Sequence, residues 1–141
     1  MASPRAQATD PFGEHTRSRV VDARPERAVV EQPAVRELDN HVGVRHASAL
    51  HAAGYAASRA LIAAALGELA ESRSVRLVES DVSYASVGLG PLTTTAEPTG
   101  RGWDALADGS SVTLASTVTT TNEQSRTVAR LELSWAVEPA A

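Results

Sequence analysis

Residues 40–71 read NHVGVRHASALHAAGYAASRALIAAALGELAE, and this stretch decides the fold. Its segment 47–71 contains eleven alanines and no proline, a composition that favours one uninterrupted helix. At 1.5 Å per residue such a helix is roughly 35 Å long. Between positions 47 and 66 the only charged residue is Arg59. Because a helix without a charged face is covered on most sides, we expect this helix at the centre of the domain.

The segments on either side of this helix have the patterns of strands. They are rich in valine, threonine and leucine or alternate between apolar and polar residues, and they span residues 28–38, 75–84, 92–96, 112–121 and 127–137. The first is interrupted by Pro33, and the last two are joined by a loop of hairpin length. One strand, a long helix and four more strands predict an α+β domain, with a five-stranded antiparallel sheet wrapped around the central helix.

The length of 141 residues suits one domain with a real core. The first thirty residues are poor in large apolar side chains and carry three prolines. We therefore predict a flexible leader over residues 1–27 and the folded domain over residues 28–141. No apolar run reaches the length of a membrane span, and the N-terminus lacks the apolar core of a signal peptide. A cytoplasmic protein without a membrane partner is expected.

Composition also excludes several classes of function. The chain has no cysteine, so it has no disulfide, thiolate metal site or cysteine nucleophile. The net charge is −4, which argues against binding to nucleic acid because that needs a basic surface. His46 and His51 lie five positions apart, which is off the spacing that places two ligands on one helix face. We therefore expect no metal site.

The residues before the central helix carry a resemblance to a known family. Asn40, Gly43 and His46, followed by Ala47 and Ser48, resemble the N-x-x-G-x-x-H-G-G motif of hotdog-fold acyl thioesterases. The branch that this motif resembles is the phenylacetyl-CoA thioesterase type and its uncharacterised relatives, in which it often reads N-H-V-G-x-x-H-A-A. The resemblance covers roughly residues 28–138. It implies the hotdog fold, and a homodimer or a dimer of dimers with active sites at the interface between paired sheet edges.

The resemblance also implies roles for the motif residues. In the family, backbone amides at the helix N-terminus hold the thioester oxygen, because free donors and the helix dipole stabilise negative charge there. These donors correspond to Ala47 and Ser48, and His46 and Gly43 belong to the same oxyanion and substrate-binding loop. Asn40 matches the asparagine that binds the thioester or positions water. The substrate would be an acyl thioester of coenzyme A or of the phosphopantetheine arm of an acyl carrier protein, with no separate cofactor.

One position departs from the family at the catalytic residue itself. The family carboxylate lies fifteen residues after the asparagine, and this chain has Tyr55 there. A phenol is a poor base at neutral pH. His51 lies four residues earlier on the same helix face and can exchange a proton near pH 7. We predict His51 as the proton-transfer group and Tyr55 as a hydrogen-bond donor, and Asp39 and Ser58 remain alternatives.

Structural interpretations of these residues remain open. His51 also fits a hydrogen-bonded core histidine, and Tyr55 also fits a side chain that fills the space of a lost carboxylate. Arg45 and Arg59 are either ligands of the substrate phosphates or surface residues. The remaining candidates, His41 in solvent and Trp103 and Trp135 as packing aromatics, are expected to be structural.

Three functions therefore stay open. The first is hydrolysis of an acyl-CoA or carrier-bound thioester, which the motif favours and Tyr55 weakens. The second is a non-hydrolytic reaction on a polyketide-like or acyl intermediate, such as cyclisation, dehydration or isomerisation, carried by His51 and Tyr55. The third is a non-catalytic acyl-binding module. The fold alone cannot rank them, because one scaffold hosts many functions.

Overall fold

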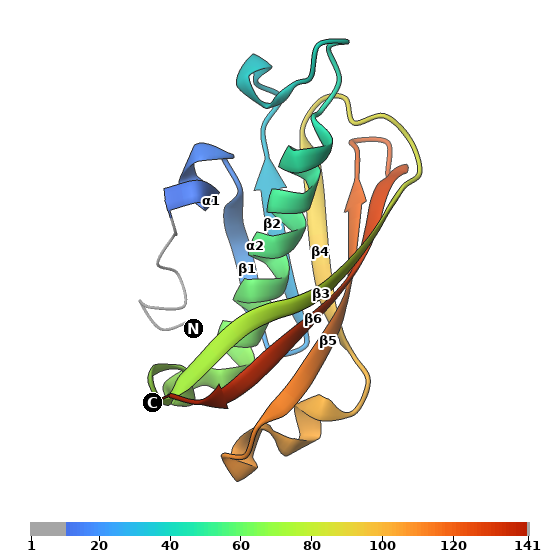
Figure 1. The fold of residues 1–141 in the computed structure, drawn as a ribbon. Coiled ribbons are helices and arrows are strands. Elements are labelled where there is room, and N and C mark those ends of the chain that lie inside the picture. The colour runs from blue at the N-terminus through green and yellow to red at the C-terminus, as the bar shows by residue number, and fades with distance from the viewer. Residues whose placement is uncertain (1–10, 141) are drawn as a thin grey trace.

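A sheet of six antiparallel strands curves around one long helix in the computed structural model, which describes residues 11–140 (Figure 1). In chain order the elements are α1 (Pro11–His15), β1 (Arg19–Arg24), β2 (Arg27–Gln32), η1 (Arg36–Leu38), α2 (Ala47–Leu66), η2 (Gly67–Ser72), β3 (Arg73–Tyr84), β4 (Leu92–Thr99), η3 (Gly102–Asp108), β5 (Val112–Thr121) and β6 (Thr127–Pro139). The order of the strands in the sheet is β1-β2-β4-β5-β6-β3. The predicted α+β architecture is confirmed.

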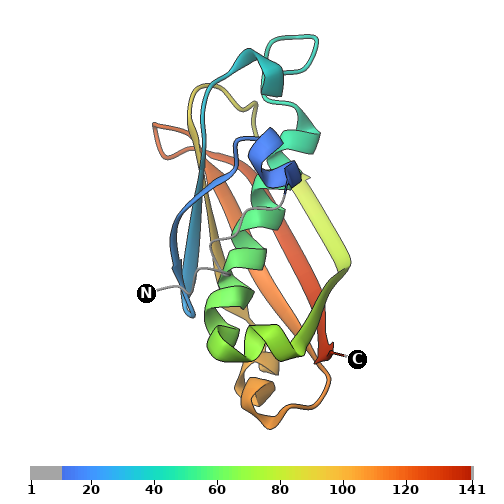
Figure 2. The same ribbon diagram turned by 90° about the vertical axis from the view of Figure 1, so that its left-hand side faces the viewer.

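The helix α2 lies along one face of the sheet, as Figure 2 shows, and its apolar side chains form the centre of the core. It begins at Ala47 as predicted, but the α-helix ends at Leu66 and continues as the 3₁₀-helix η2. Gly67 causes this change, because its φ of 55° is incompatible with a continuing helix. At Gly54, an added Cβ would lie 2.6 Å from Cδ2 of Leu131. Glycine therefore allows α2 to approach β6 closely.

The expectation that no segment has the length and hydropathy of a membrane span was wrong. Residues Ala47–Ser72 meet both criteria, because an 18-residue window within them has a mean hydropathy of 1.2. However, 67% of this window is buried inside the fold. Its position is that of the core helix of a soluble α+β domain.

The sheet has one strand more than predicted, because β1 lies in the segment that we expected to be a flexible leader. Residues 11–27 form α1, β1 and the turn into β2, whereas residues 1–10 lie outside the described residues. Three of the six residues of β1 are charged, and its pairing with β2 has an irregularity between Val20 and Asp22. As a half-exposed edge strand, β1 needs little apolar surface, so it lacks a clear sequence signal. The predicted strand over 28–38 ends at Gln32, directly before Pro33.

The pairing of β3 with β6 contains a bulge that matters for the site. Leu77 pairs with Trp135 and Ser80 pairs with Leu133, so Val78 is the extra residue. Trp135 and Leu133 are fully buried in the core. Because the bulge shifts the alternation by one residue, Ser80 faces the same side of the sheet as Leu77. Among the described strands, β3 pairs with β6 alone, so its other edge is open.

Candidate active site

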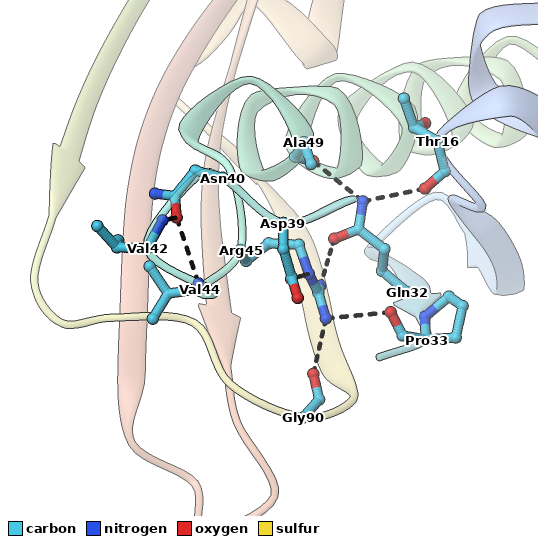
Figure 3. A network of polar contacts seen from close by, with 10 residues as sticks. All are labelled: Thr16, Gln32, Pro33, Asp39, Asn40, Val42, Val44, Arg45, Ala49 and Gly90. Atoms are coloured by element: carbon cyan, nitrogen blue, oxygen red, sulfur yellow. Dashed lines mark hydrogen bonds and ion pairs between the residues drawn. The ribbon is translucent and has the colours of Figure 1, made fainter. Parts of the chain in front are cut away.

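The loop before α2 is shaped by the side chain of Asn40. Its Oδ1 accepts hydrogen bonds from the backbone amides of Val42, at 3.0 Å, and Val44, at 3.3 Å (Figure 3). Gly43 has a φ of 82°, a left-handed conformation that favours glycine. In the free protein the amide oxygen of Asn40 is therefore engaged in forming the loop.

His46 caps the helix. Its Nδ1 accepts a hydrogen bond of 3.0 Å from the backbone amide of Ser48, and its own amide donates to the carbonyl of Leu38. The amide of Ser48, one of the two predicted oxyanion donors, is thus already bonded. Within residues 11–140 the amide of Ala47 has no hydrogen-bond acceptor. A single exposed donor, supported by the helix dipole, remains at this terminus.

The structure brings His51 and Tyr55 together on the face of α2 that begins at Ala47. These three positions are spaced by four residues, so they form one row along the helix. Nε2 of His51 lies 2.9 Å from Oγ of Ser80 on β3. The ring of Tyr55 packs against Trp135 on β6, with 5.0 Å between ring centroids and 55° between ring planes. The face of α2 that carries His51 and Tyr55 therefore contacts the end of the sheet formed by β3 and β6.

Ser80 was missed by the sequence analysis. Strict alternation along residues 75–84 places Ser80 on the side opposite Val75 and Leu77, which pack against the core. The bulge at Val78 reverses this assignment and turns Ser80 toward α2. Ser80 is exposed and His51 is half-buried, so a substrate can reach both side chains.

Ser58, an alternative catalytic residue, is fully buried. Its Oγ accepts a hydrogen bond of 2.7 Å from Nε1 of Trp135 and lies 2.6 Å from Oγ of Ser116. Ser58 satisfies polar groups inside the core, where no substrate can reach it. The alternative of a reactive Ser58 is wrong.

Arg45 is buried beneath the loop, so the alternative that it binds a substrate phosphate is wrong. Its guanidinium donates hydrogen bonds to Oε1 of Gln32, at 2.6 Å, and to the carbonyls of Pro33, at 3.0 Å, and Gly90, at 2.7 Å (Figure 3). Its Nε has no hydrogen-bond partner and lies 4.0 Å from Oδ1 of Asp39. Burial lowers the pKa of Arg45, and the charge of Asp39 acts in the opposite direction.

Gln32 extends this network to the first turn of α2. Its Nε2 donates to the carbonyls of Ala49, at 3.0 Å, and Thr16, at 3.2 Å. Gln32 is only 1% exposed, and nothing in the sequence around it indicates a buried polar residue. Asp39, the other alternative base, lies beside Arg45 and acts there as a counter-ion. Together these side chains fix the start of α2 against β2 and the loop around Gly90.

The remaining candidates are structural or exposed. Nε1 of Trp103 donates to the carbonyls of Thr99 and Ala115, and Trp135 is fully buried, so both indoles pack as predicted. His41 is exposed and Arg59 is half-buried. Among residues 11–140, no group of three or more His, Asp or Glu side chains could hold a metal ion.

A cleft of about 700 Å³ lies at the other edge of the sheet. It is lined by residues of α1, β1, the end of β2 and the loops beside them, namely Gly13, Glu14, Arg17, Ser18, Arg19, Glu31, Gln32, Pro33, Ala34 and Pro91. Of the residues predicted to form the site, it contains none. Figure 2 shows β1 and β3 on opposite sides of α2.

Comparison with known structures reveals close likenesses in fold. AziG from S. sahachiroi has a TM-score of 0.76 at 23% identity, over 94% of this chain and 100% of that chain. PA5026 from Pseudomonas aeruginosa, a protein of unknown function named a probable thioesterase, has a TM-score of 0.80 at 14% identity, over 96% and 91% of the two chains. A variant of the thioesterase SAV0944 from Staphylococcus aureus has a TM-score of 0.72 at 17% identity, over 92% and 100%.

Identities below 25% show the fold alone, and the fold that these proteins share with this chain is the hotdog fold. No curated protein matches the sequence. The model of a family described as a domain of unknown function (DUF4442) matches residues 2–137. By sequence the chain belongs to the DUF4442 family, and its fold is the hotdog fold.

Proposed function

We propose that this protein hydrolyses acyl thioesters, with His51 as the proton-transfer group. The observation that carries the proposal is the position of His51. Its imidazole lies on the helix face that begins at the unbonded amide of Ala47, and its Nε2 is within hydrogen-bond distance of an exposed hydroxyl group. An oxyanion donor and a base on one accessible surface are the two elements that acyl transfer needs.

The predicted site residues other than Ser48, whose amide is already bonded to His46, have a place in this proposal. The amide of Ala47 binds the thioester carbonyl oxygen, and His46 supports the same helix end by capping it. Asn40 and Gly43 hold the preceding loop. Tyr55, at the position of the family carboxylate, supplies a hydroxyl that has no hydrogen-bond partner among the described residues and so can donate to the substrate. The acyl group would be carried by coenzyme A or by an acyl carrier protein.

The open edge of β3 supports a homodimer in which two such edges pair. This edge strand is 12 residues long, and Val78 and Tyr84 on it are exposed. A long open edge with apolar side chains favours pairing with another strand. Since Ser80 lies on the same strand, the two sites of such a dimer would lie next to the interface.

The test is hydrolysis of a panel of acyl-CoA esters, followed through the coenzyme A thiol with a thiol-specific dye. The chain has no cysteine, so the dye reports only the product. His51→Ala should lower the rate about 10²–10⁴-fold, the usual contribution of a general acid or base. His15→Ala in α1 is the matched control and should leave the rate unchanged. An equal rate in His51→Ala and the wild type would contradict the proposal.

The same variants address the second candidate, a non-hydrolytic reaction that uses His51 and Tyr55. The absence of a carboxylate at position 55 favours this candidate. It predicts that the wild type converts an acyl or polyketide-like thioester without releasing coenzyme A. Mass spectrometry of the reaction mixture separates the two reactions, because only hydrolysis produces the free acid and the thiol.

A further inference from the structure

We propose that Ser80 is a catalytic nucleophile, activated by His51, which accepts the acyl group from the thioester substrate. The proposal rests on the proposed function and names the residue that attacks the thioester. Nε2 of His51 lies 2.9 Å from Oγ of Ser80, across 29 positions of sequence. A hydroxyl within hydrogen-bond reach of an imidazole is the arrangement that activates a serine, because the ring can accept the proton as the oxygen attacks.

Ser80 differs from the other serines near the core in its partners and its accessibility. Ser58 and Ser116 are fully buried and hydrogen-bonded to each other. Ser83 is exposed on the same strand, but it pairs with Arg130 and faces the outer side of the sheet. Among the described residues, Ser80 is the one serine whose hydroxyl is bonded to a histidine side chain.

The local fold places Ser80 in a suitable environment for an acyl group. The bulge at Val78 turns Ser80 to the inner side of the sheet, together with Leu77 and Val82 on either side of it along β3. Both neighbours are half-buried and pack against the core. The hydroxyl therefore lies between apolar side chains on a paired strand, which limits its motion more than a loop would.

The reaction balances with the groups that are present. The bond between Oγ of Ser80 and the carbonyl carbon forms as the hydroxyl proton passes to Nε2 of His51. The carbonyl oxygen becomes an oxyanion, which the amide of Ala47 and the positive end of the α2 dipole stabilise. The C–S bond then breaks, and the leaving thiolate takes the proton from the imidazolium. The product of this half-reaction is an ester of Ser80.

Water completes the cycle. His51 takes a proton from water as the hydroxide attacks the ester carbonyl, and it returns the proton to Oγ of Ser80 as the C–O bond breaks. The free acid leaves, and the serine and neutral histidine are restored. This route needs no carboxylate at position 55, which is the position where the chain departs from the family.

The first experiment needs no knowledge of the substrate. Wild-type protein is treated with a fluorophosphonate, which reacts with activated serines, and the adduct is measured by intact mass and located by peptide mapping. We expect one adduct per chain on Ser80, no adduct on Ser80→Ala, and labelling slowed at least about 100-fold in His51→Ala. Ser83→Ala, altered three residues away on the outer face, should be labelled like the wild type. An unlabelled wild type, or equal labelling of Ser80→Ala, would overturn the proposal.

The second experiment tests the role of Ser80 as the nucleophile separately from the proposed hydrolysis of thioesters. Wild type, Ser80→Ala and His51→Ala are compared on an acyl-CoA ester that the wild type hydrolyses, and acid-quenched samples are searched for an acylated Ser80 peptide. We expect the acyl adduct in the wild type and rate losses of at least about 100-fold in both variants. If Ser80→Ala keeps the wild-type rate while His51→Ala loses it, hydrolysis through His51 stands and the nucleophile is refuted. If no acyl-CoA is hydrolysed, but the fluorophosphonate labels Ser80 in the wild type and labels His51→Ala much more slowly, Ser80 stands as the nucleophile and the proposed function is refuted.

Discussion

Nη1 of Arg45 donates a hydrogen bond of 2.6 Å to Oε1 of Gln32, and both side chains are almost completely buried. This contact joins the residue directly before the helix cap to the end of β2. Gln32 in turn bonds the carbonyl of Ala49 in the first turn of α2. The position of the helix terminus therefore depends on a buried polar network rather than on apolar packing alone.

Arg45→Met should destabilise the protein by about 3–5 kcal/mol, because it leaves the buried acceptors of Gln32, Pro33 and Gly90 without their donor. The free energy of unfolding is measured by urea denaturation. Arg19→Met is the matched control, since the side chain of Arg19 is 74% exposed and lies 3.9 Å from Glu31. Its loss should cost less than about 1 kcal/mol. Similar unfolding midpoints for the two variants would contradict the structural role of Arg45.

Asn40→Ala should cost about 1–3 kcal/mol, because two backbone amides of the loop lose their acceptor. Asn40→Asp keeps the Oδ1 acceptor and should retain most of the stability, whereas it lacks the amide donor for the substrate. Activity and unfolding are measured for both variants. Full activity in a well-folded Asn40→Ala protein would remove Asn40 from the site.

Tyr55→Phe should keep the stability of the wild type, because the ring contact with Trp135 remains and the hydroxyl has no partner among the described residues. Its rate should fall less than that of His51→Ala, because Tyr55 donates a hydrogen bond and does not transfer the proton. Tyr55→Glu restores a carboxylate at the family position. Hydrolysis gained in Tyr55→Glu, together with unchanged turnover in His51→Ala, would refute the mechanism through His51.

The open edge of β3 predicts a homodimer at micromolar concentration, measured as molar mass by light scattering. Val78→Lys places a charge at the exposed bulge of this edge and should shift the protein toward the monomer, because a lysine on an edge strand opposes pairing. Val21→Lys on β1 tests the opposite edge and should leave the mass unchanged. A monomeric wild type would refute the dimer and the placement of the sites beside its interface.

The sequence by itself determined the central helix and most of the sheet. The alanine-rich segment without proline predicts a helix that begins at Ala47, and the predicted strand 112–121 coincides with β5. The formation of these elements depends on residues a few positions apart in the sequence, so the periodicity of apolar residues predicts them. The motif from Asn40 to His46 leads into the helix as predicted, whereas its turn and cap bonds, although local, were not assigned from the sequence.

Only the tertiary structure decided which polar residues are buried and which meet. From the sequence, Arg45 is expected to be a surface residue or a phosphate ligand. Its hydrogen-bond acceptors instead lie 12 to 45 positions away, and they surround it in a buried site. Ser80 reaches His51 because the pairing of β3 with β6 contains one extra residue, which places Ser80 opposite the buried Leu133. Alternation within one strand cannot reveal a bulge, because the bulge is a property of two paired strands.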